Sequence, residues 1–258
     1  MQQQLKAQDK SPVFEAGSSA ISLTRLGNPS LLDEMQSVVR FYFGRPPDFY
    51  VQMETSKYTA LVADAQDELN RRCIARQLAD DRRDILSGIL ASDRILVQSH
   101  LYLRATRPVR GGQESVGWHR ESFYGSSVET AVNFWVPILN VTIENTLLYV
   151  PDSHLIPDEA IVTKNEEDPT VRRGSAGHRI GLLYSPKRII SGVDFSTQCP
   201  FVVLPGEAAI FSGQLIHGAA VNRSDKIRFS ADLRLIAAEN LRTNKWHFAS
   251  GKNYFESL

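Results

Sequence analysis

Two histidines and one glutamate are the residues of this chain best suited to hold a metal ion. His119 and Glu121 stand two positions apart in the stretch GWHRESFYG, and His217 follows in GQLIHGAAV. Side chains two apart on an extended segment project from the same face, so His119 and Glu121 can grip one ion while Arg120 turns away. Two neutral imidazoles and one carboxylate suit non-haem Fe(II) and leave its other coordination positions open for oxygen chemistry. Taken alone, the His-x-Glu triplet is much more typical of a solvated strand face than of a metal site.

A second group of residues could bind an anionic cosubstrate beside that ion. Arg228 lies eleven positions after His217 (228 − 217 = 11), and Ser230 shares its strand face. A 2-oxo acid can chelate a metal through its carboxylate and keto oxygens. The far carboxylate of 2-oxoglutarate then needs a planar, permanently charged partner, which a guanidinium offers. Arg228 and Ser230 fit this description, and Arg234, on the same face, is the alternative clamp.

Composition excludes several other classes of protein. The 258 residues contain 29 Lys and Arg against 29 Asp and Glu, so no long-range field favours nucleic acid or an acidic membrane. Cys73 and Cys199 lie far apart and match no ligand spacing, which predicts two reduced thiols. No apolar run approaches the roughly 20 residues that span a bilayer, and the first residues lack the apolar core of a signal peptide. We expect a cytoplasmic protein with a small-molecule substrate and no nucleic-acid or membrane partner; the oligomeric state is left open.

The elements that must position these residues change in character near residue 95. Residues 1–28 are polar and predict a flexible tail. From Ser30 to about residue 94, apolar residues recur at helical intervals, which predicts a helix that ends near Gly44 and one or two longer helices after it. From 95 to about 240 the chain has short β-branched and aromatic runs separated by turns. Helices followed by many strands predict one mainly β domain over 29–258, with a jelly-roll core and a helical layer.

The polar segment from Ile156 to Gly177 is long for a plain connection between strands. It changes from acidic at Glu166-Glu167-Asp168 to basic at Arg172-Arg173. We predict a lid that closes over the metal when substrate binds. A surface insertion without a role is the alternative.

In order and spacing, these pieces resemble the Fe(II)/2-oxoglutarate-dependent oxygenases, specifically the phytanoyl-CoA dioxygenase-like branch. That branch shows a His-x-Asp, a Trp, a stretch like NG…PGSH, a PGD…F…HG segment, and an Arg eleven residues past the second His. The matching stretches here, within about residues 95–237, are His119-Arg-Glu121, Trp135, ENTLLYVPDSH from Glu144 to His154, Pro205-Gly-Glu207, Phe211, His217-Gly218 and Arg228. Glu121 stands where the branch usually has Asp, and Thr146 and Asp152 replace usual glycines.

The resemblance implies both a site and an activity. It implies that His119, Glu121 and His217 bind Fe(II), and that Arg228, Ser230 and Trp135 bind 2-oxoglutarate, although Trp135 is equally well explained as a core residue. The implied reaction hydroxylates or otherwise oxidises an unactivated C–H bond. The size and the single domain suggest a small metabolite of a biosynthetic pathway as substrate, and the family analogy alone leaves an acyl-CoA open. In that reaction, 2-oxoglutarate and O2 become succinate and CO2.

Two other functions fit parts of the pattern. A cupin-type metal-dependent isomerase or lyase would use the same core, but it would give Arg228 and Ser230 no function. A non-catalytic binding domain could also keep an oxygenase fold. Degenerate copies of that kind usually lose a metal ligand, whereas His119, Glu121 and His217 are all present.

Overall fold

The computed structural model describes residues 12–15, 18–108, 117–125, 128–166, 171–172, 175–182, 187–242 and 253–258. The helical part comes first, as predicted, and consists of α1 (Ser30–Tyr42), α2 (Pro47–Val51), α3 (Thr55–Arg71), α4 (Ile74–Asp81) and α5 (Arg83–Leu90). The long periodic stretch after Gly44 therefore holds more helices than the one or two expected. One of its breaks falls at Cys73, whose left-handed backbone (φ 56°) ends α3 and starts α4.

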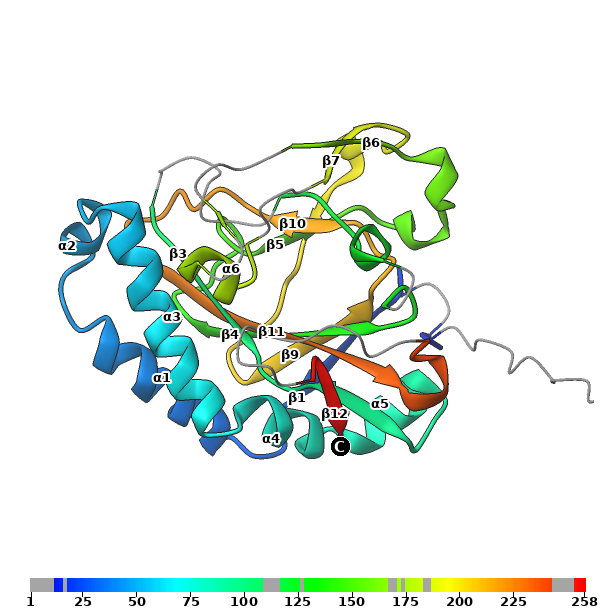
Figure 1. Ribbon diagram of the computed structural model, residues 1–258, viewed down its shortest axis with the longest axis horizontal. Coiled ribbons are helices and arrows are strands. Elements are labelled where there is room, and N and C mark those ends of the chain that lie inside the picture. Colours follow the sequence, from blue (N-terminus) through cyan, green and yellow to red (C-terminus); the bar gives the residue numbers. More distant parts are fainter. Residues whose placement is uncertain are drawn as a thin grey trace, which may run out of the picture.

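Most strands belong to one antiparallel sheet with the order β1-β9-β4-β11-β2-β12, and β3 also pairs with β11 (Figure 1). Its strands are β1 (Ile21–Arg25), β2 (Ile95–Gln98), β3 (Tyr102–Thr106), β4 (Val132–Leu139), β9 (Glu207–Ser212), β11 (Arg228–Ala237) and β12 (Phe255–Ser257). A second, smaller sheet has the order β10-β5-β8, formed by β10 (His217–Ala219), β5 (Leu147–Tyr149) and β8 (Cys199–Pro200). This confirms the predicted mainly β, jelly-roll-like core with N-terminal helices.

Alternation along β11 divides the main sheet into an apolar face and a polar face. Phe229, Ala231, Leu233 and Leu235 belong to the large core formed with the helices. The intervening residues are polar: Arg228, Ser230, Asp232 and Arg234. Because successive side chains point to opposite sides of a strand, these four share the face turned away from the helices. Every residue of this strand that could bind a charged group is thus brought to one side.

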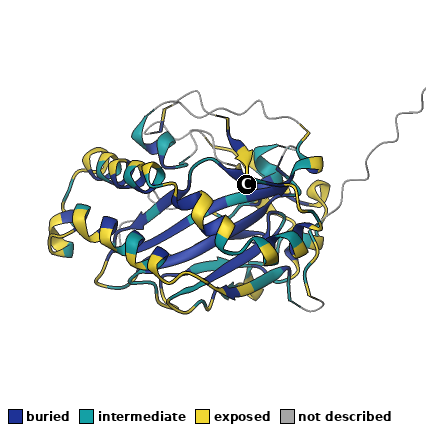
Figure 2. Cartoon of the chain, turned by 90° about the horizontal axis from the view of Figure 1, so that it is seen from below, coloured by how far each residue is buried: buried dark blue, intermediate teal, exposed yellow. Residues whose placement is uncertain are grey.

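The helices cover the apolar face of the main sheet. Seen from below in Figure 2, they lie across the buried strands with their exposed residues outward. Leu31, Met35, Val38 and Val39 form the buried side of α1, and their successive spacings of four, three and one are those of one helical face. The helical layer therefore closes one side of the sheet and leaves its polar side for the smaller sheet.

The smaller sheet faces the main sheet across a second, smaller apolar cluster. This cluster contains Trp135, Ala209 and Phe211 from the main sheet, with Phe201 and Leu215, and Leu147 and Tyr149 of β5 pack against it. The polar side chains of β11 therefore lie in the space between two sheets. They do not lie on an open surface.

One prediction about the connecting segments is wrong, and another stays untested. Residues 21–25 fall within the predicted tail but form β1, which pairs along its whole length with β9; residues 1–11 and 16–17 lie outside the described residues. The polar segment that starts at Ile156 contains a short 3-10 turn and β6 (Val162–Asn165), which pairs with β7 (Lys187–Ser191). Of this segment, residues 167–170 and 173–174 lie outside the described residues, and its closure over a metal stays a prediction.

Among the residues that the structure describes, none of the helices combines the length and the apolar character needed to cross a bilayer.

Candidate metal centre

His119, Glu121 and His217 come together between the two sheets. One ligand atom from each, an imidazole nitrogen or a carboxylate oxygen, lies within 4.8 Å of the others. The two imidazole rings have centroids 4.3 Å apart. Glu121 and His217 are buried, and His119 is partly buried. The three residues selected from the sequence thus form one compact group with the donor set that Fe(II) takes in two-histidine, one-carboxylate sites.

Backbone hydrogen bonds hold the three residues in register. His119 and His217 exchange both N–H···O bonds, at 2.9 and 3.0 Å, as an isolated antiparallel bridge. The N–H of Glu121 then donates to the carbonyl of Gly213 at 2.7 Å. The segment with His119 and Glu121 is therefore bonded to the stretch from Gly213 to His217, which places the three side chains beside one another.

The predicted strand through His119 and Glu121 is only partly right. Arg120 between them is extended (φ −140°, ψ 165°), so the side chains on either side of it do share a face. Glu121, however, begins a 3-10 turn over Glu121–Tyr124 rather than continuing a strand. Arg120 points away, where its guanidinium lies 2.9 Å from the carboxylate of Asp158.

Hydrogen bonds leave one nitrogen of each imidazole available to a metal. Nδ1 of His119 lies 2.7 Å from the carbonyl of Gly117, and Nδ1 of His217 lies 2.9 Å from that of Leu215. A carbonyl can only accept, so Nδ1 carries the proton and Nε2 keeps its lone pair. Burial lowers the pKa of both imidazoles, and for His119 the nearby His217 lowers it further. Both rings are therefore neutral near pH 7, the form that binds metal.

Glu121 offers one free oxygen to the same space. Its side chain is 1% exposed, and Oε2 accepts a hydrogen bond from Nε of Arg234. Oε1 is buried and has no hydrogen-bond partner among the described residues. A buried carboxylate oxygen without a partner is costly unless something binds it. The residues present therefore fit a divalent metal, with Nε2 of each histidine and Oε1 of Glu121 as the ligand atoms.

Because Gly213 has no side chain, the Glu121 side chain has space beside it. A Cβ at this position would lie 2.9 Å from Cγ of Glu121 and 2.6 Å from the carbonyl oxygen of Ala131. We expect Gly213→Ala to displace Glu121, to weaken metal binding measured by Co(II) titration, and to lower stability by about 1–3 kcal/mol. Gly88→Ala is the control, because its Cβ would meet nothing within 4 Å. Metal affinity in Gly213→Ala equal to that of Gly88→Ala would contradict this reading.

Arg228 is a buried cation on the same face of β11. It is 1% exposed, and Nη1 donates to Oγ of Ser230 at 3.1 Å while Nη2 donates to Oγ1 of Thr106 at 2.8 Å. Nε is buried without a partner, and none of the ion pairs found in the described part of the chain involves Arg228. Burial lowers its pKa to about 10, and the nearby Arg104 contributes. An unneutralised buried guanidinium is a suitable site for a carboxylate.

The other arginine that the sequence left open has a different partner. Arg234 binds Glu121 and the hydroxyl of Tyr254. Burial opposes its charge, but the adjacent Glu121 carboxylate and the surrounding tyrosine hydroxyls together outweigh this and raise the pKa of Arg234. Arg228 is therefore the better placed of the two for a cosubstrate carboxylate.

Trp135 lies on β4, directly opposite Asp232 of β11. Its ring is 1% exposed and packs in the apolar cluster between the sheets. Its Nε1 is buried and has no hydrogen-bond partner among the described residues. This position fits a core residue, and its contact with 2-oxoglutarate stays a prediction.

Sequence reasoning missed a partly buried ion pair at the same face. Arg104 of β3 makes a two-pronged contact with Asp232, at 2.6 and 3.0 Å, and Nη1 donates to the carbonyl of Ile180 at 2.8 Å. Asp232 lies in β11, where polar and apolar residues alternate in the sequence. Nothing in the sequence indicates that Arg104, 128 positions away, is its partner.

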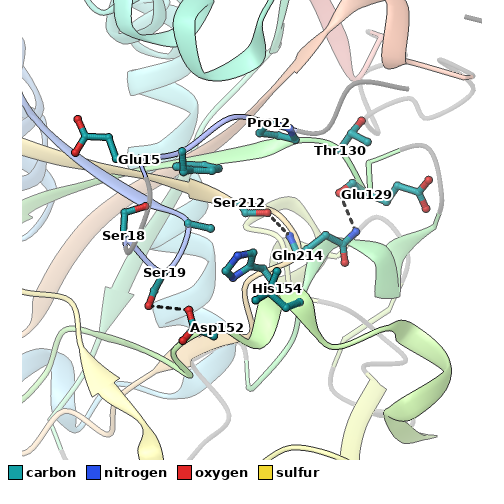
Figure 3. Close-up of a pocket in the computed structure, with 13 residues that line it drawn as sticks. Pro12, Glu15, Ser18, Ser19, Glu129, Thr130, Asp152, His154, Ser212 and Gln214 are labelled. Carbon is teal, nitrogen blue, oxygen red and sulfur yellow. Dashed lines mark hydrogen bonds between the residues drawn. The ribbon is translucent and has the colours of Figure 1, made fainter. Parts of the chain in front are cut away.

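His154 lies apart from the metal cluster. Together with Asp152, Ser212 and Gln214 it lines a separate cavity of about 470 Å³ beside the residues that precede β1 (Figure 3). The neighbouring Ser153 is instead structural, because its hydroxyl accepts a hydrogen bond from the N–H of Ile216 at 2.8 Å.

A family model for phytanoyl-CoA dioxygenase matches residues 30–230, well over half of the chain, including the three clustered residues and Arg228. The chain belongs to the phytanoyl-CoA dioxygenase family. This confirms the resemblance seen in the sequence, and together with the His–Glu–His cluster it supports the predicted Fe(II), 2-oxoglutarate and O2. Comparison with curated proteins gives no significant match.

Solved structures share this family member's fold at low sequence identity. EvdO2 from Micromonospora carbonacea var. aurantiaca, complexed with 2-oxoglutarate, superposes with a TM-score of 0.57 at 14% identity, covering 89% of this chain and 94% of that one. A second crystal structure of EvdO2 superposes with a TM-score of 0.54 at 14% identity, covering 84% of this chain and 86% of that one. A non-haem monooxygenase, ThoJ in its apo form, gives 0.51 at 17% identity, covering 85% and 75%.

Proposed function

We propose that this chain is an Fe(II)- and 2-oxoglutarate-dependent oxygenase that hydroxylates an unactivated C–H bond of a small metabolite. The observation that carries the proposal is the pairing of two buried features between the same sheets. One is the His119–Glu121–His217 cluster with an unpartnered carboxylate oxygen, and the other is the unneutralised Arg228. A metal site alone would fit many activities, whereas a second site for a carboxylate is specific to a 2-oxo diacid cosubstrate.

Bound iron would supply the redox chemistry, in which substrate, O2 and 2-oxoglutarate give hydroxylated product, succinate and CO2. The two imidazoles are held neutral and oriented by the carbonyls of Gly117 and Leu215, so no proton must leave before the metal binds. Arg228, with Ser230 and Thr106 beside it, would hold the far carboxylate of 2-oxoglutarate. The polypeptide would hold the metal, cosubstrate and substrate in position and exclude water from the site.

The ligand set favours hydroxylation over halogenation. A halide would need the coordination position that the Glu121 carboxylate fills. The Arg228–Ser230 pair disfavours a cupin-type isomerase or lyase, because such a reaction has no need of a buried carboxylate clamp. The complete His119–Glu121–His217 set disfavours a non-catalytic domain.

The substrate class follows from the charge balance and the enclosed site. Equal numbers of acidic and basic residues give no field that would gather a polyanion. The ligand residues lie between two sheets, where a small molecule fits better than a polymer strand. We therefore propose a small metabolite of a biosynthetic pathway as substrate, and a cytoplasmic enzyme.

The test is to incubate the iron-loaded protein with 2-oxoglutarate, O2 and fractionated metabolite pools. We expect a product heavier by one oxygen atom, with that atom derived from labelled O2, and succinate formed in equal amount. The His217→Ala variant is the control and should form neither. A product lighter by two hydrogens would replace hydroxylation with desaturation or ring closure. Substrate turnover that does not consume 2-oxoglutarate would refute the proposed function.

A further inference from the structure

Arg234 holds the carboxylate that completes the metal cluster. It stands six residues after Arg228 on the same face of β11 (234 − 228 = 6), and Nε donates to Oε2 of Glu121. We propose that Arg234 is a positioning residue for Glu121, and that Tyr254, from the C-terminal segment, holds Arg234 in place. The inference rests on the proposed metal site. It adds a residue that acts on a ligand and does not itself touch the metal.

The two oxygens of Glu121 have different surroundings, and this gives Arg234 its role. Oε2 is bound to the guanidinium, whereas Oε1 is buried and unpartnered among the described residues. A carboxylate with both oxygens free could rotate, or could offer both of them to an ion. With Oε2 engaged, Oε1 is the oxygen turned to His119 and His217. Outer partners of this kind fix the orientation of metal ligands and tune their affinity.

The turn that carries Glu121 packs against Arg234. Glu121 starts a 3-10 turn, and Tyr124 in the same turn places its ring 5.3 Å from the guanidinium carbon of Arg234. The backbone that carries the ligand and the arginine that orients it are thus packed against each other. The contact is enclosed as well, because the side chains of Arg234 and Glu121 are 12% and 1% exposed. In such surroundings an ion pair is little screened by salt.

The C-terminal segment reaches this site through Tyr254. Its hydroxyl contacts Nη1 of Arg234 and donates to Oε1 of Gln98 at 2.9 Å. Gln98 is fully buried at the end of β2, and β12, which follows Tyr254, pairs with β2. Gln98, Tyr254, Arg234 and Glu121 therefore form a continuous chain of contacts from the edge of the main sheet to the metal cluster.

The use of Arg234 as a cosubstrate clamp is disfavoured by the same contacts. Its charge is already paired with the Glu121 carboxylate, whereas the printed partners of Arg228 among the described residues are the neutral hydroxyls of Ser230 and Thr106. Arg234 and Tyr254 also lie beyond the residues matched by the family model, which ends at 230. The assignment therefore comes from this chain's own contacts.

The experiment is an oxygen-independent titration of the full-length protein with Co(II), followed by calorimetry and by visible absorption. Arg234→Met should raise the Co(II) dissociation constant by about 10–100-fold, the range for lost outer partners of ligands. At saturating Co(II) its spectrum should differ from that of the wild type, because Glu121 is free to rotate. Arg234→Lys keeps the charge and should recover part of the affinity. Tyr254→Phe removes one hydroxyl and should give a smaller loss in the same direction.

Controls separate this inference from the proposed function. Arg25→Gln removes an arginine that is 85% exposed and should bind Co(II) as the wild type does. If His217→Ala binds Co(II) with wild-type affinity, the proposed assignment of the metal site is refuted. If His217→Ala loses binding while Arg234→Met and Tyr254→Phe keep wild-type affinity and spectrum, only the role of Arg234 is refuted. Tighter binding in Arg234→Met would also overturn it, since Arg234 would then compete with the metal. Should Arg234→Met fail to fold, Tyr254→Phe and Arg234→Lys decide the question.

Discussion

His217→Ala and His119→Ala should each abolish metal-dependent turnover and leave the fold intact. Each substitution removes one of three ligands, so we expect the Co(II) dissociation constant to rise by more than about 100-fold, beyond the range for lost outer partners. Titration calorimetry measures the affinity, and far-ultraviolet circular dichroism measures the fold. The backbone bridge between residues 119 and 217 uses only N–H and C=O groups, so alanine can keep it.

His154→Ala is the matched control for these two variants. It removes an imidazole of the same size from a neighbouring part of the chain, but from the separate cavity rather than from the cluster. We expect its Co(II) affinity to equal that of the wild type. Equal losses in His154→Ala and His217→Ala would mean that metal binding does not depend on the cluster, and the oxygenase proposal would then fail.

The three clustered residues could be selected from the sequence because the chemistry of a metal site restricts residue type. An Fe(II) site needs imidazole and carboxylate, and the chain has only six histidines. The extended backbone at Arg120 brings His119 and Glu121 to one face, which is a local rule. The bridge that brings His217 beside them is a pairing over nearly a hundred positions, and nothing local in the sequence specifies it.

The outer residues of the site were missed for the same reason. Thr106 belongs to no recognisable motif, and its contact with Arg228 depends on the register between β3 and β11. Arg234 was correctly placed on the face of Arg228, but alternation gives a side chain's face and not its partner. Its contact with Glu121 requires the 3-10 turn that replaced the expected strand.

The correction at β1 has a similar origin. Residues 21–25 form a strand because β9 offers them a free edge, and each of the five residues has a partner from Glu207 to Phe211. The short run ISLTR has weak local preference and lies in a polar stretch, so a local reading assigns it to a tail. Helix and strand content is predictable from local periodicity, whereas edge pairing is decided by the rest of the sheet.

Arg228→Ala should weaken 2-oxoglutarate binding severely while metal binding persists. The variant loses a charge-assisted contact to a carboxylate in a buried site, which costs about 2–5 kcal/mol, or about 30-fold to several thousand-fold in affinity. The measurement is calorimetric titration of 2-oxoglutarate into Co(II)-saturated protein. Ser230→Ala should show a smaller loss, since it removes one neutral partner of the guanidinium. Arg228→Lys keeps the charge but not the planar fork, so its loss of 2-oxoglutarate affinity should lie between those of Ser230→Ala and Arg228→Ala.

The stability of the protein without ligands gives an independent check on the same residue. Arg228 is a buried cation with no acidic partner among the described ion pairs, so the fold bears its desolvation until an anion binds. Arg228→Met should therefore melt at the same or a higher temperature than the wild type, while losing the stabilisation that 2-oxoglutarate confers. If Arg228→Met instead lost stability strongly and Arg228→Ala kept its affinity for 2-oxoglutarate, the arginine would be a structural residue. The carboxylate clamp would then have to be sought elsewhere on the polar face of β11.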